Sequence, residues 1–386
     1  LAGAPPTWIH AVSVGEVAVA LKLATKMREL EPATRVVLTT TTTTGFAFAA
    51  REAHDWMQVM YNPVDFWPVV QRAFAAIRPA RMVLVEAEVW PNLTAEARAR
   101  RVPIALVNAR LSGRSERRFR RFRFFVAPVF GCLDLVCVQE QRDIARWQAL
   151  GVRRERIAEV GSIKYDLSDK RGASRLPFEV LNSLGIDAFN GPILLGGSTH
   201  EGEERILADV FLRLRKEFTG LALIIAPRHA ERAPEIRLLL EQLGCAVALR
   251  SEAVEASRGK PDCLLLDTTG ELQDWYGVAT VVFMGKSLTA HGGQNPVEAI
   301  RAGKPVVYGP HMENFAALAR SLIEQEAAIE VRDGIMLEQK CAELLRHAEL
   351  RDALTQNAER VLVRHRGATE RTARLLLSLT SRRAAG

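Results

Sequence analysis

Short runs of aliphatic and β-branched residues alternate with helix-like stretches along nearly all 386 residues of the chain. Strands that alternate with helices in this way are typical of parallel sheets covered by helices on both faces. The runs form two series: 8–12, 36–40, 57–61, 82–85, 104–107 and 135–138, then 193–195, 221–226, 246–249, 264–266, 281–284, 306–308 and 328–331. The sequence therefore predicts an α/β protein with two Rossmann-like units.

The segment between the two series has the composition of a linker. It is rich in Lys, Arg, Gly and Ser and ends at Gly191-Pro192. We predict a first domain over 1–165, a linker over 166–191 and a second domain over 192–386, since one hydrophobic core stops growing near ~250 to 300 residues. Two such domains resemble the GT-B architecture of glycosyltransferases, in which donor and acceptor occupy opposite walls of an interdomain cleft.

Charge and cysteine content narrow the function classes without choosing among them. The net charge of +7 favours an anionic partner, which nucleic acid, a membrane surface or a phosphorylated small molecule would satisfy. The five cysteines are scattered and include no Cys-x-x-Cys pair, which argues against a disulfide framework or a zinc site. No apolar run approaches the ~18 to 20 residues that cross a bilayer, so we expect the chain as given not to span a membrane.

Acidic residues follow two strands of the first domain. Glu16 comes after the first strand and opens a predicted helix, and Glu86 and Glu88 end the strand at 82–85. Ligands of parallel sheets bind beyond the carboxyl ends of the strands, and clustered carboxylates raise one another's pKa, which suits a general base. Position alone favours an ordinary first-turn glutamate for Glu16, and Glu-x-Glu is also common at solvated edges.

Cationic residues are concentrated in two places of the first domain. Six arginines lie within 114–123 and alternate with phenylalanines that continue to Phe125. On a helix this pattern predicts a surface for anionic headgroups or stacked nucleotides, and the alternative is a half-buried helix with a solvated arginine face. Lys164 stands near the predicted hinge, where it could meet a phosphate or carboxylate or be a plain surface lysine.

The second domain carries polar loops at successive strand ends. In the last of them, Asn295 is predicted as a helix N-cap, Pro296 as the first helical residue and Glu298 as the completing acid, so capping alone could explain these residues. The glycines and hydroxyls of the first loop have a phosphate-cradling composition that recurs widely. The four loops are 196–204, 226–229, 267–272 and 291–298.

The order and spacing of these motifs are more specific than any one of them. They are Ser-Val-Gly-Glu at 13–16, Glu-x-Glu-x-Trp-Pro-Asn at 86–92, Asn-Ala-Arg-x-Ser at 108–112, Gly-Ser-x-Lys-x-Asp at 161–166, Pro-Arg-His at 227–229, Thr-Gly-Glu-Leu at 269–272 and Gly-Gly-x-Asn-Pro-x-Glu-Ala at 292–299. Across nearly the whole chain they resemble the 3-deoxy-D-manno-octulosonic acid (Kdo) transferases.

The resemblance implies an inverting glycosyltransferase that moves Kdo from CMP-Kdo, its donor substrate, to the phosphorylated lipid A precursor (lipid IVA) in lipopolysaccharide core biosynthesis. It implies Glu16 as general base and Glu86 and Lys164 as groups that stabilise the transition state. The implied CMP contacts are Pro227, Arg228, Thr269, Gly270, Glu271, Asn295, Pro296, Val297 and Glu298. We expect no cofactor and no metal ion, because no Asp-x-Asp motif ends a strand.

The resemblance also implies a location, and the chain departs from the family pattern in two places. Family members act at the cytoplasmic face of the bacterial inner membrane, where the stretch 114–125 could lie on an anionic surface. The family usually begins with a membrane-anchoring helix that this chain lacks, which we interpret as truncation or an unusual start. Many relatives have a sequence similar to Gly-Gly-Ser-Leu at the position where this chain has Met-Gly-Lys-Ser-Leu, residues 284–288.

Two other functions stay open from sequence. One is another GT-B enzyme, a nucleotide-sugar transferase or epimerase, which would bind uridine nucleotides tightly. The other is a non-catalytic protein that binds anions or nucleic acid through the arginine-rich helix, with a steep salt dependence. The second does not explain the acidic residues at strand ends, so we expect no nucleic-acid partner.

Overall fold

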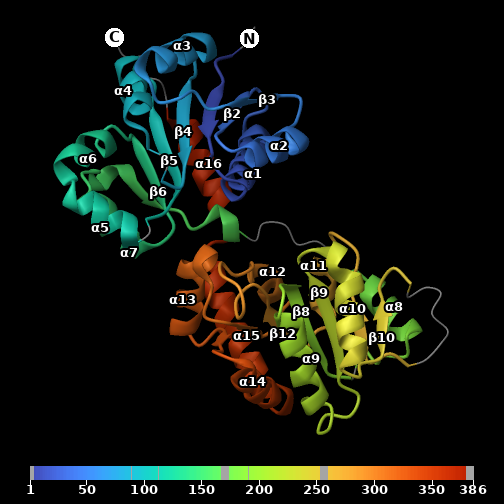
Figure 1. Cartoon of the computed structure of the whole chain (residues 1–386). Coiled ribbons are helices and arrows are strands. Elements are labelled where there is room, and N and C mark those ends of the chain that lie inside the picture. Colours follow the sequence, from blue (N-terminus) through green and yellow to red (C-terminus); the bar gives the residue numbers. More distant parts are fainter. Residues whose placement is uncertain are drawn as a thin grey trace. The chain divides into compact units, whose positions relative to one another are not determined.

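The computed structural model describes residues 4–87, 89–111, 113–166, 174–189, 191–252 and 260–379. The chain divides into two compact units, Leu1–Ser168 together with Arg364–Gly386, and Asp169–Val363. Each unit has a central sheet with helices packed on both faces, as Figure 1 shows. The α/β fold class predicted from sequence is confirmed.

The first unit is built on a parallel seven-stranded sheet of order β3-β2-β1-β4-β5-β6-β7. Its strands are β1 Thr7–His10, β2 Val36–Thr40, β3 Met57–Tyr61, β4 Arg81–Val85, β5 Ile104–Ala109, β6 Leu135–Val138 and β7 Ile157–Glu159. Its helices are α1 Val14–Leu30, α2 Thr43–Glu52, α3 Trp67–Ile77, α4 Pro91–Ala99, α5 Gly113–Arg121, α6 Arg123–Phe130, α7 Gln141–Ala149 and α16 Ala368–Ser378, with 3₁₀ turns η1 Arg154–Arg156 and η2 Ile163–Tyr165.

The second unit repeats this plan with the order β10-β11-β9-β8-β12-β13-β14, again parallel. Its strands are β8 Ile193–Thr199, β9 Ala222–Pro227, β10 Val247–Leu249, β11 Cys263–Leu265, β12 Val281–Met284, β13 Val306–Tyr308 and β14 Ile329–Glu330. Its helices are α8 Leu176–Ser183, α9 Glu203–Leu214, α10 Ala233–Gln242, α11 Leu272–Trp275, α12 Val297–Arg301, α13 Ala316–Glu324, α14 Gly334–Arg346 and α15 Ala348–Val363, with η3 Ala230–Arg232, η4 Tyr276–Val278 and η5 Glu313–Phe315.

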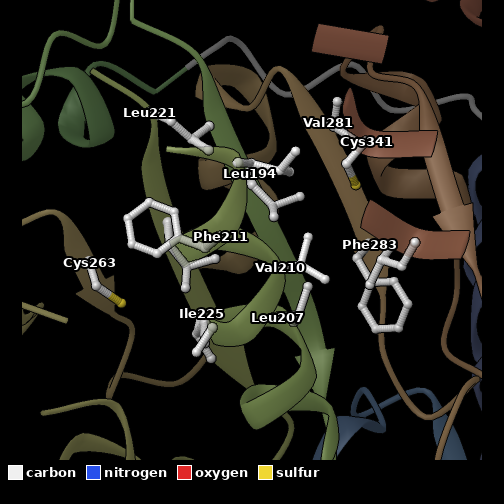
Figure 2. Close-up of a cluster of buried hydrophobic side chains, with 14 of the residues drawn as sticks. Leu194, Leu207, Val210, Phe211, Leu221, Ile225, Cys263, Val281, Phe283 and Cys341 are labelled. Carbon is white, nitrogen blue, oxygen red and sulfur yellow. The ribbon is translucent and has the colours of Figure 1, made fainter. Parts of the chain in front are cut away.

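The core of the second unit lies between its sheet and α9. Leu207, Val210 and Phe211 of α9 pack with Leu194 and Ile225 of the central strands, and Figure 2 shows these side chains gathered over the sheet. Burying one such side chain contributes about 1.5–3 kcal/mol. The aliphatic runs that predicted the strands are therefore the residues that stabilise them.

The last helix belongs to the first unit, although the sequence alone places 192–386 in one domain. The carboxylate of Asp166 accepts hydrogen bonds from the backbone N–H groups of Gly367 (2.8 Å) and Thr369 (2.7 Å) at the start of α16. Ala373 and Leu376 of α16 join the core that α1 forms on its sheet. The amphipathic pattern of a helix indicates that one of its faces packs on apolar residues, but it does not indicate which of the two sheets provides them.

The predicted linker at 166–191 is partly helical. Pro177, Val180 and Leu181 of α8 are buried, and α8 lies within the second unit. Residues 167–173 and Asn190 lie outside the described ranges. Within those ranges, no helix combines the length and the apolar character needed to cross a membrane.

Two buried histidines of the first unit make its stability depend on pH. Burial lowers the pKa of both His10 and His365 to about 4. Consistently, Nδ1 of His365 accepts a hydrogen bond from the backbone N–H of Ser162 at 3.1 Å, which requires that nitrogen to carry no proton. Between about pH 6.5 and about 4 only the unfolded chain binds these protons, so the free energy of unfolding falls as the pH is lowered.

We expect His365→Asn, whose amide oxygen can still accept from Ser162, to reduce this pH dependence by about 1 kcal/mol per pH unit. Urea unfolding of the two proteins between about pH 7 and about pH 5 measures it. The exposed His54 provides the control, and His54→Gln should keep the original slope. A His365→Asn slope equal to that of the parent chain would contradict the assignment.

Candidate functional site

Glu16 lies in the first turn of α1, where the start of the helix holds its carboxylate. Oε2 accepts from the backbone N–H of Val12 and Oε1 from the hydroxyl of Ser13, both at 2.9 Å, while Oγ of Ser13 accepts from the Glu16 N–H at 3.3 Å. This reciprocal bonding is close to a capping box. The structure therefore places Glu16 at the carboxyl end of β1 and adds a capping contact to the first-turn position that its sequence indicated.

Glu86 follows β4 in an unusual backbone conformation. Its φ of 61° lies in the left-handed region, which residues other than glycine rarely adopt. The position is fixed by its neighbours, since its N–H donates to the Val107 carbonyl at 2.9 Å and its carbonyl accepts from the Arg110 N–H at 3.3 Å. Such conformations cost about 1–3 kcal/mol and cluster at functional sites.

The predicted catalytic residues interact electrostatically. Burial raises the pKa of Glu86, and Glu16 raises it further, whereas Arg110 and Lys164 lower it. Burial lowers the pKa of Lys164, and Glu86 opposes that shift. The structure thus brings Glu16, Glu86 and Lys164 together at the carboxyl edge of the first sheet, with Arg110 beside them. We call these four residues the acid–cation cluster.

Two members of this region received no role from sequence. Arg110 acts on both Glu86 and Lys164, and Asn108 positions the turn that carries Lys164. The buried Oδ1 of Asn108 accepts from the Ser162 hydroxyl (3.1 Å) and from the Ile163 N–H (3.2 Å). Both residues belong to the motif at 108–112, which begins within the last two residues of β5, so their place at a strand end was the available signal.

Two residues of these motifs, Glu88 and Ser112, lie outside the described residues.

In the second unit, the residues predicted to contact CMP lie at the carboxyl ends of neighbouring strands. Pro227 ends β9, and the exposed guanidinium of Arg228 follows it with no ion-pair partner among the described residues. Thr269, Gly270 and Glu271 follow β11, which pairs with β9. The carboxylate of Glu271 is paired with Arg250 at 3.0 Å.

The loop after β12 differs in detail from the predicted cap. Helix α12 begins at Val297 with Pro296 at its N-cap, one residue later than expected. Oδ1 of Asn295 accepts from the Val297 N–H at 3.2 Å, a local turn that orients the entry to the helix. Glu298 interacts instead with Tyr276, whose pKa is raised by burial and then by this carboxylate.

Further polar groups join the same edge of the second sheet. Nε2 of Gln294 lies 3.3 Å from Nε2 of His200, and the ring of His200 lies 5.9 Å from that of His229. These contacts connect the exits of β12, β8 and β9. Burial lowers the pKa of His200, Glu203 opposes this, and nearby Lys286 lowers it again. Lys286 and the exposed Arg228 therefore supply the positive charge of this edge, a composition suited to an anionic ligand.

Glu203 and the glycines of β8 have structural roles here. The buried Glu203 carboxylate accepts backbone hydrogen bonds from Lys286 (2.8 Å), Ser287 (2.9 Å) and Leu288 (3.0 Å), which fixes the loop after β12. A Cβ at Gly196 would lie 2.5 Å from Leu207, and one at Gly197 2.9 Å from the Tyr276 hydroxyl. Close packing accounts for these two glycines without a phosphate.

The arginine- and phenylalanine-rich stretch forms an exposed surface of the first unit. None of the residues of α5 is buried, and Phe124 and Phe125 of α6 are 87% and 74% exposed. Within it, the guanidinium of Arg118 lies 5.4 Å from the ring centroid of Phe119. Phe119 itself packs on the core of the first unit, whereas Phe124 and Phe125 remain exposed, so the stretch has a half-buried side and an exposed side suited to anionic headgroups.

Comparisons with known proteins show which family the chain resembles in sequence. Residues 2–167 match the family model described as 3-deoxy-D-manno-octulosonic-acid transferase (kdotransferase). A 3-deoxy-D-manno-octulosonic acid transferase of Haemophilus influenzae is 32% identical and aligns with 97% of this chain and 88% of its own. The Bordetella pertussis protein of the same description is 35% identical and aligns with 96% of this chain and 86% of its own.

Solved structures share the fold at lower identity. Anabaena HepE in complex with UDP superposes with a TM-score of 0.62 at 14% identity, covering 97% of this chain and 100% of that one. A putative UDP-N-acetylglucosamine 2-epimerase from Listeria monocytogenes superposes with a TM-score of 0.61 at 12% identity, covering 97% of this chain and 96% of that one. These likenesses confirm the predicted fold of two Rossmann-like units.

The acid–cation cluster predicts opposite effects of two substitutions on Glu86. Glu16→Gln removes a negative charge near Glu86 and should lower the pKa of Glu86. Lys164→Met removes a positive charge near Glu86 and should raise that pKa, and each shift should be on the order of 1 pH unit. A ¹³C NMR titration of labelled glutamate carboxyl carbons measures both, with Glu86→Gln identifying the signal.

The control is Lys26, which pairs with Glu29 on the surface of α1. Lys26→Met should leave the Glu86 titration unchanged. Shifts of the same sign in the Glu16 and Lys164 variants would contradict the cluster.

Proposed function

The chain belongs to the 3-deoxy-D-manno-octulosonic acid (Kdo) transferase family, and from this premise we propose that it is an inverting glycosyltransferase that transfers Kdo from CMP-Kdo to the lipid A precursor (lipid IVA) in lipopolysaccharide biosynthesis. The observation that carries the proposal is the acid–cation cluster at the carboxyl edge of the first sheet. Ligands of parallel sheets bind at that edge, and the cluster holds both a base and positive charge.

In the proposed reaction the acceptor hydroxyl attacks the anomeric carbon of Kdo from the face opposite CMP. The new carbon–oxygen bond forms as the bond to the CMP phosphate breaks, and the phosphate leaves with the electron pair, which inverts the configuration. Glu16 takes the proton of the hydroxyl. Among the described residues, each of its carboxylate oxygens accepts one hydrogen bond and retains a further lone pair, so capping orients the base without exhausting its acceptors.

The positive residues are suited to the charges that the reaction handles. In the first unit, Lys164 and Arg110 can stabilise the Kdo carboxylate and the transition state beside Glu86. In the second unit, we propose that Arg228 and the loops 269–271 and 295–298 bind CMP, with Lys286 near the departing phosphate. Because these cations neutralise the phosphate, we propose that transfer needs no metal ion and no cofactor.

The acceptor is a lipid, and the α5–α6 surface offers a way to reach it. We propose that the exposed Phe124 and Phe125 enter the headgroup region while neighbouring arginines contact anionic lipid. This would hold the protein at the cytoplasmic face of the bacterial inner membrane. The exposure of these aromatic rings supports the proposal, since the surfaces of monomeric soluble proteins rarely present large contiguous apolar patches.

Glu16→Gln and Glu16→Ala should lower the rate of Kdo transfer by a factor on the order of 10² to 10⁴, the usual contribution of a general base, while CMP binding is retained. The assay incubates the protein with CMP-Kdo and lipid A precursor and weighs the products by mass spectrometry.

Since Glu16→Ala also removes a helix cap, Asp333→Ala is the matched control. Oδ1 of Asp333 caps α14 through the Met336 N–H at 2.8 Å in the second unit, and its loss should cost about 1 kcal/mol of stability without slowing transfer. Near-normal turnover of both Glu16 variants would remove that residue from the mechanism.

Arg228→Ala should weaken CMP binding by about 10- to 100-fold, because a hydrogen bond to a charged group contributes about 1.5–3 kcal/mol. Calorimetric titration with CMP measures the change. Arg237, which pairs with Glu241 on the surface of α10, is the control, and Arg237→Ala should bind CMP as the parent does. UMP binding as tight as that of CMP would favour a uridine nucleotide enzyme instead.

A further inference from the structure

Two histidines and a glutamate that have no part in the proposed reaction converge in the second unit. His291 follows β12, while His311 and Glu313 follow the neighbouring strand β13. Oε1 of Glu313 lies 3.0 Å from Nδ1 of His291 and 3.5 Å from Nδ1 of His311, and the two imidazole centroids are 3.9 Å apart. One ligand atom from each side chain lies within 4.8 Å of the other two.

The backbone around these side chains is fixed by hydrogen bonds. Oε2 of Glu313 accepts from the Gly292 N–H at 2.7 Å, which leaves Oε1 directed at both imidazoles. The Asn314 N–H donates to the Gly292 carbonyl at 2.9 Å, and the His311 N–H donates to the Ser287 carbonyl at 3.0 Å. The two loops therefore hold the backbone of these three residues in place before any ligand arrives, and hydrogen bonds of this kind orient the ligands of metal sites.

We propose that His291, His311 and Glu313 bind one divalent transition-metal ion of the zinc class. Zinc–nitrogen and zinc–oxygen bonds of about 2.0–2.2 Å in a tetrahedron separate neighbouring ligand atoms by about 3.3 Å, close to the observed spacings. Two neutral imidazoles and one carboxylate are ligands that Zn²⁺ accepts readily, whereas Mg²⁺ prefers oxygen ligands. A fourth position stays open to water.

The chain contains a natural contrast to this trio. His347 and Glu349 form a pair at 3.0 Å, and His229 and Glu231 form one at 3.2 Å. Among the described residues, neither pair belongs to a group of three metal-ligating side chains. Each of these pairs therefore offers two ligand atoms, whereas His291, His311 and Glu313 together offer three. The third ligand is what distinguishes the trio from an ordinary exposed histidine–carboxylate pair.

The ion would join the loop after β12 to the loop after β13. The first of these loops continues from His291 to Asn295, so the ion would restrain the segment that enters α12. The ion would thus restrain a segment that the proposed CMP site includes, without taking part in the chemistry of transfer. Sequence gave no signal for it, because 22 residues separate His291 from Glu313 and neither lies in a zinc-binding spacing.

The test is calorimetric titration of the full chain, freed of metal with a chelator, with ZnCl₂ and in parallel with MgCl₂. We expect saturable binding of one Zn²⁺ per chain and no comparable binding of Mg²⁺. His311→Ala and Glu313→Gln should each weaken Zn²⁺ binding by at least about 10- to 100-fold. His347→Ala, the matched control, should bind Zn²⁺ as the parent does.

Thermal unfolding provides a second readout, because an ion that binds only the folded state raises the midpoint. Zn²⁺ should raise the midpoint of the parent and of His347→Ala but not that of His311→Ala or Glu313→Gln. The proposal is overturned if the parent shows no saturable Zn²⁺ binding, or if the His311 and Glu313 variants bind Zn²⁺ as tightly as the parent.

Discussion

Parallel hydrogen bonding of the strands brings all the carboxyl ends of a sheet to one edge, and the functional chemistry of each unit depends on that constraint. In the first unit it places Glu16, after β1, beside Glu86, after the adjacent strand β4. In the second it aligns the loops that follow β11, β9, β8 and β12. Residues far apart in sequence thus share an edge without any need for long loops.

The edge can hold buried charge because the charges compensate one another. A carboxylate such as Glu86 loses hydration when buried, and a second carboxylate nearby adds to the cost, as the upward shift of its pKa indicates. Lys164 and Arg110 offset part of this cost, and the strained backbone at Glu86 keeps its side chain at the cluster. The members shift one another's pKa, so removal of one member changes the titration of the others.

Much of this could be predicted from sequence, and the failures share a cause. The aliphatic runs predicted most of their strands to within two residues, since a buried parallel strand must be apolar on both faces, although β8 continues four residues beyond the predicted end at Leu195. The short edge strand β7 was missed because Ile157 is its only buried residue, so it has no continuous apolar run. The attachment of α16 to the first unit and the contacts of Arg110 depend on which elements meet in space, which local composition does not encode.

Helix capping and function are compatible at these strand ends, and Glu16 and Glu203 indicate why. Both carboxylates open a helix that follows the first strand of their unit, and both accept backbone hydrogen bonds. Glu203 is fully buried and accepts from the loop after β12 as well, so its acceptors are consumed by structure. Glu16 accepts one backbone and one hydroxyl hydrogen bond and is 9% exposed. The first turn of the helix after the first strand therefore holds a purely structural carboxylate in the second unit and one with spare acceptors in the first, as the proposed general base requires.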